Sequence, residues 1–519
     1  MLLSTFQLDG NDALVVYGNV DLVYEVSLQL EQAPTVVTSG TTRITSMYSD
    51  NENSFIVNFV VAKGITTVEL ETPQKTVVLL IADYDTATNL WMPTIAGDGE
   101  LAEYVDVEAS APFLVRGPYL VRTATLSSDG LALTGDLNAE GSTVLTVYGP
   151  STLGSITWNG RKLEPVKVAG GTWQAEIGTS GASIEIPDLM KAQWRYKDSL
   201  PEIGAGFEDE SLVIADHTET TNTFPPYYGG PWILYADDYG FHAGNLLWRG
   251  TFQHNDSLPL PTAVNISVSG GIHFAASAWL NEHFLGSSDT LLATNNESWP
   301  VTKDMLVDGD NHVTVLQDHM GGNLAGQIVC CTPGGRQRDL QQPRGLQGYY
   351  LVGRPEDKQF TRWELAGNLG GEDFPDKTRK ILNEGGLYAE RKGWHLPGFD
   401  DSEWELRTPF QGLDKPGVGF FRTTFNLNLP GNHDVPLSIV FEDMPGHYRA
   451  QLYINGWQMG KRVANIGPQT SFVVHQGILN YEGENVIGVS LWALGEDEGD
   501  LKIPSLRIER GGGVYEGGV

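Results

Sequence analysis

The sequence predicts an all-β protein of several domains, and its composition, its turns and a long internal repeat carry this prediction. Its 519 residues include 61 Gly and 27 Pro, with 40% hydrophobic and 19% charged residues. Frequent Gly and Pro beside Val, Thr, Tyr and Trp favour short strands and tight turns over helices. A chain of this length is long enough for several hydrophobic cores. Its patterning does not show the alternation of helix and parallel strand that an α/β barrel requires.

The internal repeat has a spacing of 174 residues. Residues 279–286 run Trp-Leu-Asn-Glu-His-Phe-Leu-Gly, and residues 453–460 run Tyr-Ile-Asn-Gly-Trp-Gln-Met-Gly. Asn311 and Asn485 keep the same spacing farther along the chain. A repeat of well over a hundred residues is too long for a solenoid unit, so it predicts two copies of a domain.

Residues 1–105 are predicted to form a first all-β region. Segments such as 54–61 and 76–81 alternate apolar and polar residues, as half-buried strands do. The alternation breaks at residues 82–91, where a short helix is expected, with Pro93 as its stop.

Residues 106–190 predict a small immunoglobulin-like sandwich, with tight hairpins at Asp129-Gly130 and Asn159-Gly160. The two repeat copies follow as residues 191–365 and 366–519, and their many short strands with irregular loops suit jelly rolls. Inside the second copy, Asn455-Gly456 predicts a two-residue turn. The equivalent Asn281-Glu282 lacks the glycine and predicts a looser turn.

The charge balance excludes some partners. The chain has 33 Lys+Arg against 65 Asp+Glu, a net charge of −32. Nucleic acids and anionic membranes require clustered cations, so neither is an expected partner, and no apolar run is long enough for a membrane helix. The first residues do not form a convincing signal peptide. Three sequons nevertheless favour a secreted, extracellular glycoprotein, with Asn255, Asn265 and Asn296 as candidate glycosylation sites.

Cofactor and metal chemistry has little support in the sequence. The only two cysteines, Cys330 and Cys331, are adjacent, a spacing that seldom forms a disulfide. They are interpreted as loop or strand residues, with pairing to another segment as the alternative. No Cys-x-x-Cys pair and no His-Glu-x-x-His motif accompanies them, so no metal and no cofactor is predicted.

No position is predicted to be catalytic, because a carboxylate pair for glycoside hydrolysis is defined by its separation in space. The carboxylates considered were Asp237, Asp238, Glu384 and Glu390, for which capped turns and packed loops are the favoured interpretation. Thirteen Trp suggest carbohydrate contacts, since sugar faces stack on indoles. Trp394, His395 and Trp457 lie near glycines at expected loop tips and are the candidates, with core packing as the alternative.

Several long phrases carry a family resemblance. Residues 235–242 read Tyr-Ala-Asp-Asp-Tyr-Gly-Phe-His, and residues 383–391 read Asn-Glu-Gly-Gly-Leu-Tyr-Ala-Glu-Arg. Together with residues 82–93, 117–124, 131–137, 244–250, 393–399, 466–472 and 477–481, they resemble the carboxy-terminal half of the secreted, fungal-type family-35 β-galactosidases. The resemblance covers nearly the whole chain and is specific from about residue 76 onward.

The resemblance implies a layout and a function. Residues 1–105 would be the end of the family's second domain, 106–190 its immunoglobulin-like third domain, and 191–365 and 366–519 its jelly rolls. In that family an amino-terminal (β/α)8 barrel hydrolyses terminal β-D-galactose with retention, using one Glu as acid/base and another as nucleophile. None of the 519 residues matches that barrel, so the implied role is a scaffold packed on it, inactive alone, in an enzyme acting on galactose-containing glycans. The alternative is a free-standing carbohydrate-binding or structural β-sandwich protein.

Overall fold

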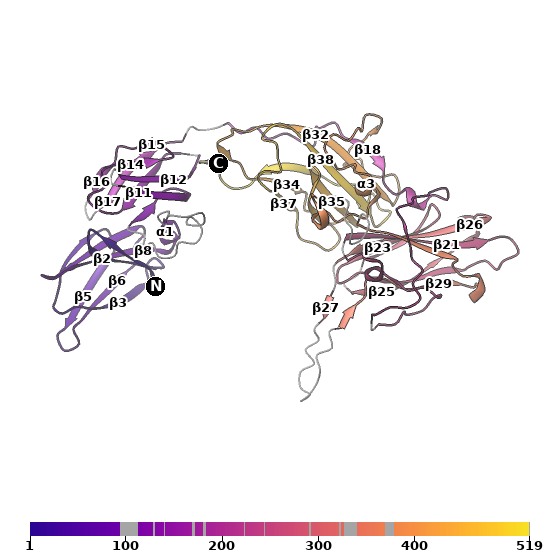
Figure 1. The fold of residues 1–519 in the computed structure, drawn as a ribbon, viewed down its shortest axis with the longest axis horizontal. Helices are drawn as coiled ribbons and strands as arrows, with labels where there is room; N and C mark the ends of the chain where they lie inside the picture. Colours follow the sequence, from indigo (N-terminus) through magenta and orange to yellow (C-terminus); the bar gives the residue numbers. More distant parts are fainter. Residues whose placement is uncertain are drawn as a thin grey trace. The chain divides into compact units, whose positions relative to one another are not determined.

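The computed structural model confirms the all-β class (Figure 1). It describes residues 1–93, 113–127, 130–139, 141–168, 172–179, 183–222, 224–242, 244–289, 292–320, 323–325, 340–368 and 378–517. These residues form two compact units. The first contains residues 1–184, 429–436 and 512–519, and the second contains residues 185–428 and 437–511. No helix in these ranges is both long and apolar enough to cross a membrane.

The first region of unit 1 is built from two sheets around one apolar core. The larger sheet has the order β1 (Leu2–Leu8), β2 (Asn11–Gly18), β8 (Thr76–Asp83), β7 (Ile65–Glu71), β4 (Thr35–Ser39). The smaller has the order β3 (Val23–Gln29), β6 (Ser54–Val60), β5 (Arg43–Ser49). The expected helix is present but shorter, as α1 (Tyr84–Ala87), capped by the Asp83 carboxylate. It ends early because Leu90 and Trp91 form a strand instead.

A second sandwich in unit 1 follows the first. One sheet has the order β16 (Val166–Val168), β17 (Thr172–Ile177), β13 (Thr143–Tyr148), β10 (Leu114–Arg116), β9 (Leu90–Trp91). The other has the order β15 (Arg161–Lys162), β14 (Ile156–Trp158), β12 (Gly130–Asn138), β40 (Tyr515–Gly517), β33 (His433–Asp434), with β11 (Leu120–Ser127) on β12. The hairpin predicted at Asn159 is confirmed, with positive φ at Asn159 and Gly160. Asp129 lies outside the described residues.

Unit 2 contains both copies of the repeat. The large sheet of the first copy has the order β19 (Val213–Ile214), β30 (Arg362–Ala366), β21 (Gly244–His254), β26 (Gly309–His319), β23 (Ala275–Leu280), β24 (His283–Asp289). Its small sheet has the order β20 (Leu234–Tyr235), β29 (Gly345–Val352), β22 (Ala263–Ser269), β25 (Thr294–Pro300). Side chains of both sheets fill one core, which makes the first copy a sandwich.

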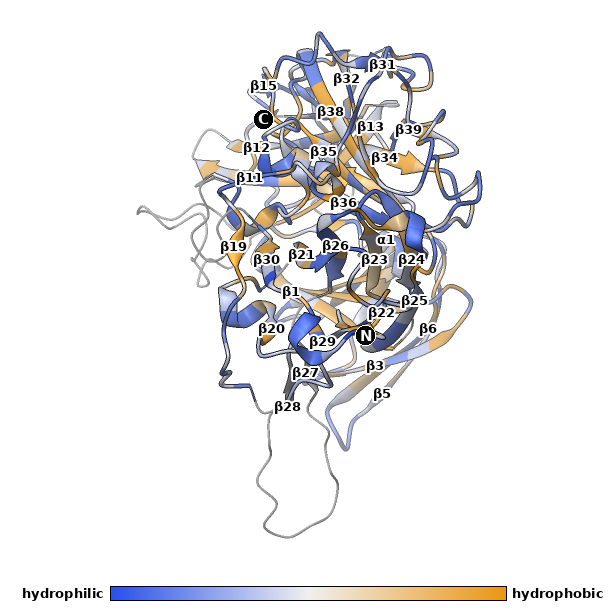
Figure 2. Ribbon diagram, turned by 90° about the vertical axis from the view of Figure 1, so that its right-hand side faces the viewer, coloured by the Kyte–Doolittle hydropathy of each residue, from blue (hydrophilic) through white to orange (hydrophobic). Residues whose placement is uncertain are grey.

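The second copy repeats this plan. Its large sheet has the order β31 (Glu405–Leu406), β18 (Arg195–Asp198), β32 (Val418–Asn428), β38 (Glu482–Ala493), β35 (Tyr448–Ile454), β36 (Trp457–Val463). Its small sheet has the order β37 (Ser471–Val474), β34 (Leu437–Phe441), β39 (Leu506–Arg510). Figure 2 shows hydrophobic residues along strands such as β19 and β34.

The remaining elements of unit 2 are short. The strands β27 (Asn323–Ala325) and β28 (Leu340–Gln342) pair with each other. The helical turns are η1 (Pro201–Ile203), η2 (Ala236–Tyr239), η3 (Lys303–Met305), η4 (Glu356–Lys358), η5 (Lys380–Leu382) and α3 (Tyr388–Arg391).

One strand crosses the boundary between the copies. The strand β18 lies in the range 191–365, yet it pairs with β32 of the second copy, with Arg195 opposite Arg422. It takes the place beside β32 that β30 takes beside β21 in the first copy. The strands β33 and β40 similarly come from the range 366–519 and pair in the sheet of β12. These three strands, β18, β33 and β40, therefore pair in sheets that lie outside the sequence range to which each strand belongs.

The repeated turns are equally tight. Leu280 pairs with His283, just as Ile454 pairs with Trp457, so the looser turn predicted at Asn281-Glu282 is wrong. The glycine that ends each repeated phrase has a packing reason. A Cβ atom at Gly286 would meet the Trp299 indole, and one at Gly460 would meet the Phe472 ring.

Candidate functional site

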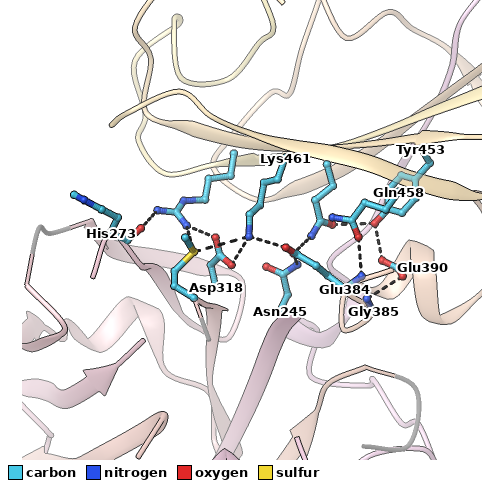
Figure 3. Close-up of polar contacts among 12 residues, drawn as sticks. Asn245, His273, Asp318, Glu384, Gly385, Glu390, Tyr453, Gln458 and Lys461 are labelled. Atoms are coloured by element: carbon cyan, nitrogen blue, oxygen red, sulfur yellow. Dashed lines mark hydrogen bonds and ion pairs between the residues drawn. The ribbon is translucent and has the colours of Figure 1, made fainter. Parts of the chain in front are cut away.

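A buried ionic network joins the two copies of the repeat (Figure 3). Asp318 at the end of β26 is fully buried and accepts hydrogen bonds from Arg449 on β35 and from Lys461 on β36. Lys461 Nζ lies 2.7 Å from Asp318 Oδ1 and 2.8 Å from Glu384 Oε1. The first copy thus contributes one carboxylate, and the second contributes both cations.

The charges in this network stabilise one another. Burial raises the pKa of Asp318, but Lys461 and Arg449 outweigh burial and hold that pKa below its usual value. Burial lowers the pKa of Lys461, but Asp318 and Glu384 outweigh it and hold the pKa above its usual value. Asp318 and Lys461 therefore stay charged near neutral pH, because each has an opposite charge in contact.

The network continues through neutral groups. Glu384 Oε2 accepts hydrogen bonds from Gln451 at 2.6 Å and from Asn245 of the first copy at 3.3 Å. The Tyr453 hydroxyl lies 2.6 Å from Glu390 Oε2 and 3.0 Å from Gln451 Oε1. Burial and the neighbouring Glu390 raise the pKa of Tyr453, so the phenol remains a proton donor. Glu384 and Glu390 are therefore committed to contacts within the protein.

Apolar contacts and a second ionic cluster reinforce the boundary between the copies. Trp279 and Trp492 belong to one buried cluster, and the Trp492 indole donates to Ser277 Oγ at 2.9 Å. Arg391 contacts the carboxylates of Glu202 and Asp209. Burial raises the pKa of Glu202 to about 7, although Arg391 opposes the shift.

The first copy also contains a large open cavity of about 840 Å³. Its lining residues are Ala205, Phe207, Glu208, Asp209, Glu210, Leu212, Arg249, Thr251, Val307, Asp308, Asp310, His312, Thr361, Arg362 and Glu364. Arg249 and Thr251 are on β21, Asp310 and His312 on β26, and Arg362 and Glu364 on β30. Because these strands are adjacent and alternate residues share a face, the sheet presents their side chains together.

Two nearly buried polar groups lie at this cavity. Arg249 is 5% exposed and donates to the carbonyl oxygens of Glu202 and Gly204, each at 3.1 Å. Its Nη1 lies 3.8 Å from Glu364 Oε2. His312 is 7% exposed, and its Nδ1 lies 3.1 Å from Thr251 Oγ1. Burial, helped by the charge of Arg249, lowers the pKa of His312 to about 4, so the imidazole is neutral near pH 7.

The second copy has a small cavity at the equivalent place. Its volume is about 190 Å³, and it is lined by Arg422 and Thr424, the counterparts of Arg249 and Thr251. Arg422 Nη1 donates to Asp401 at 2.5 Å. The counterpart of His312 is Val486. The two cavities therefore differ in size, and His312 lines the larger one whereas Val486 does not line the smaller.

The three carbohydrate-contact candidates lie in two environments. Trp394 and His395 are 5% and 4% exposed. The Trp394 ring packs 4.8 Å from that of Trp404, between ring centroids, inside an aromatic cluster. Trp457 is half-buried at the start of β36, with the Arg379 guanidinium 5.2 Å from its ring centroid. Sugar contact by these residues stays a prediction.

The remaining predicted residues are placed as follows. Asn255 is exposed in a turn, Asn296 is exposed on β25, and Asn265 is half-buried on β22. Cys330 and Cys331 lie outside the described residues. Within the described ranges, no group of three or more His, Cys, Asp or Glu side chains is arranged to hold a metal ion.

Reasoning from the sequence missed Arg249 and His312. Arg249 lies in a phrase that both copies share, so the repeat explains it as a structural residue. Position 312 could have been identified from the sequence, because aligning the copies places His312 opposite Val486.

Comparison with known protein families gives two matching models. The model described as β-galactosidase domain 3 matches residues 91–174. The model described as the β-galactosidase second all-beta domain matches twice, at residues 207–323 and 388–497. The two matches of the second model fall on the two copies of the repeat.

Curated relatives extend the similarity along the chain. The β-galactosidase A of Aspergillus niger is 37% identical over 506 residues, which cover 96% of this chain and 48% of that protein. The probable β-galactosidase A of Neosartorya fischeri is 37% identical over 491 residues, covering 94% and 47%. The chain spans about half the length of these relatives. Among solved structures, a Pleurotus ostreatus lectin aligns with a TM-score of only 0.17 at 9% identity over 63% of this chain and 81% of the lectin, too low to support an argument.

Proposed function

We propose, from the premise that this chain belongs to the all-β domains of the β-galactosidases, that it is the accessory scaffold of such an enzyme. Similarity to fungal β-galactosidase A over 94% of this chain, covering 47% of the relative, carries the proposal. In this proposal, catalysis takes place in a part of the enzyme that these 519 residues do not match. That part is a (β/α)8 barrel that removes terminal, non-reducing β-D-galactose with retention.

The contacts between the two repeat copies support a scaffold role. Asp318, Lys461 and Glu384 are paired across the boundary, beside the apolar cluster of Trp279 and Trp492. Removing Asp318 would leave the buried cations Lys461 and Arg449 without a full countercharge, which favours a single arrangement of the copies. Two sandwiches fixed in this way form one block that is suited to supporting a catalytic domain.

We assign the whole enzyme to galactose-containing glycans outside the cell. The net charge of −32 and the three sequons, two of them on exposed asparagines, support this assignment. Mass spectrometry of the protein secreted by a eukaryotic host would test it. Glycan attached at Asn255 or Asn296 is the expected result, and secretion without any glycan would contradict the glycoprotein assignment.

Hydrolysis of a chromogenic aryl β-galactoside tests whether catalysis lies outside these 519 residues. The purified 519-residue chain should give no turnover above buffer at mildly acidic pH. Turnover that survives rigorous purification would contradict the scaffold role.

Complementation tests the partnership itself. The part of Aspergillus niger β-galactosidase A that this chain does not match would be expressed alone and together with the chain. Co-expression should raise its soluble yield and its activity, whereas co-expression with an unrelated β-sandwich protein should not. Equal activity with both partners would contradict packing on a catalytic domain.

A further inference from the structure

We propose that the cavity at Arg249 and His312 in the first repeat copy is a binding site for a neutral, hydroxyl-rich saccharide. Its volume of about 840 Å³ lies in the range of about 300–1,000 Å³ that is typical of ligand pockets. The site would bind whether or not the chain forms part of a hydrolase.

The first argument is the polar capacity that the protein leaves unused at the cavity. His312 pairs with Thr251 through Nδ1, and Nε2 forms no hydrogen bond to a described residue. Arg249 Nη1 has the Glu364 carboxylate at 3.8 Å, beyond hydrogen-bond distance. Both residues line the cavity, so a ligand hydroxyl can accept a hydrogen bond from Arg249 Nη1 and can form one with His312 Nε2.

The second argument is the internal comparison between the copies. Val486 occupies the position of His312 and is buried, so the fold accepts an apolar residue there. Arg422, the counterpart of Arg249, donates a hydrogen bond to the Asp401 carboxylate. The cavity that Arg422 lines has a volume of only about 190 Å³. The fold therefore requires neither the histidine nor the larger cavity, which points to a role in binding.

The third argument concerns the charge of the ligand. Six carboxylates line the cavity against two arginines, so an anion would be repelled. A metal ion is disfavoured, because no described group of three ligands is arranged to hold one. A neutral saccharide offers hydroxyls that donate to carboxylates and accept from Arg and His. The half-buried Phe207 ring at the cavity adds an apolar surface for a sugar face.

The test is titration of saccharides into the complete chain, with binding measured by saturation-transfer NMR and by calorimetry. A neutral disaccharide, lactose, and a neutral polysaccharide, β-1,4-galactan, distinguish a free oligosaccharide from a polymer as the source of the ligand. Polygalacturonate is the anionic comparator. Saturable binding of at least one neutral ligand, with no binding of polygalacturonate, is the expected result.

Two variants locate the site. His312→Val installs the residue of the second copy and should weaken binding about tenfold or more, through loss of a buried hydrogen bond. Arg362→Ala removes a cavity-lining side chain that is half exposed, so it keeps the test valid if His312→Val does not fold. The matched control is His475→Val, at an exposed position of the second copy, and should bind like the parent.

Three results would overturn the proposal. They are the absence of binding by both neutral ligands, equal binding of polygalacturonate, and unchanged affinity in both cavity variants. Circular dichroism of each variant establishes that the comparison is made between folded proteins.

Discussion

Asn281 and Asn455, 174 residues apart, hold their hairpins with the same hydrogen bonds. Asn281 Nδ2 donates to Asn311 Oδ1 at 3.1 Å, and Asn455 Nδ2 donates to Asn485 Oδ1 at 2.9 Å. Asn281 Oδ1 accepts from the backbone N–H of His312 at 3.0 Å, and Asn455 Oδ1 accepts from that of Val486 at 2.8 Å. Both residues have positive φ, 53° and 48°. Asparagine recurs because it tolerates this backbone and also ties the turn to the next strand.

Asn455→Ala should therefore destabilise the protein by about 2–5 kcal/mol. The estimate combines the cost of positive φ for alanine, about 1–2 kcal/mol, with that of unpaired buried groups, about 1–3 kcal/mol. Chemical denaturation followed by fluorescence measures the change. Asn426→Ala, at an exposed position of β32, is the control and should change stability little. Equal stabilities of the two variants would show that the turn contacts are unimportant.

Asp318→Asn should cost about 3–5 kcal/mol, because it leaves Lys461 and Arg449 without a full countercharge in a buried place. Thermal unfolding of the complete chain measures the loss. Asp256→Asn breaks the exposed contact with Lys303 and should leave the unfolding temperature nearly unchanged. A stable Asp318→Asn variant would mean that the copies do not depend on the network.

The lowered pKa of Asp318 fixes the pH range of this effect. The carboxylate stabilises the folded state above the usual Asp pKa of 3.8, and this stability is lost as the pH falls through the lowered pKa. The penalty of Asp318→Asn should accordingly be similar at pH 6 and pH 8. A penalty that disappears at pH 6 would contradict the assigned direction of the shift.

Glu202 should make stability fall as the pH rises toward neutrality. Its pKa is raised from 4.5 to about 7, so the folded state binds the proton more tightly than the unfolded state does. The resulting stabilisation is fully present below about pH 4.5 and is lost as the pH rises to about 7. Glu202→Gln mimics the protonated form and should melt higher than the parent at pH 8 but not at pH 4.5. The comparison is made by circular dichroism.

Exposed Glu405→Gln, on β31, is the matched control for that experiment. It should shift the melting temperature equally little at both pH values. If Glu202→Gln behaved in the same way, burial of Glu202 would not govern the pH dependence.

The position of β18 predicts how the chain divides into folding units. A fragment of residues 366–519 lacks β18, which leaves the edge of β32 unpaired and removes the contact of Tyr196 with Phe421. It should be unfolded or aggregated, whereas residues 185–511 should melt cooperatively. Size-exclusion chromatography measures the association state of each fragment, and thermal unfolding measures its cooperativity. A cooperative, monomeric 366–519 fragment would show that β18 is dispensable.

Much of the fold could be predicted, because its signals are local. The turn at Asn455, the hairpin at Asn159 and the capping Asp83 each depend on residues close in sequence, whose backbone preferences the sequence states directly. The turn at Asn281 was predicted wrongly because Asn281 alone of its two central residues has positive φ, so position 282 does not require the glycine that has positive φ at 456.

The candidate sites were harder to predict, since they depend on distant pairs. Lys461 and Asp318 are separated by 143 positions, and nothing near either residue identifies its partner. Trp394 lies beside a glycine, as a loop-tip residue would, yet four aromatic rings surround it.

The all-β class, the duplication and the family resemblance were readable from the sequence, because periodicity, turn residues and repeated phrases are properties of short segments. The sheet that receives β18, the charges that meet at the boundary between the copies, and the position of His312 at a cavity became visible only in the folded chain. Those outcomes follow from strand neighbours and burial, which arise only when segments far apart in the chain are brought together.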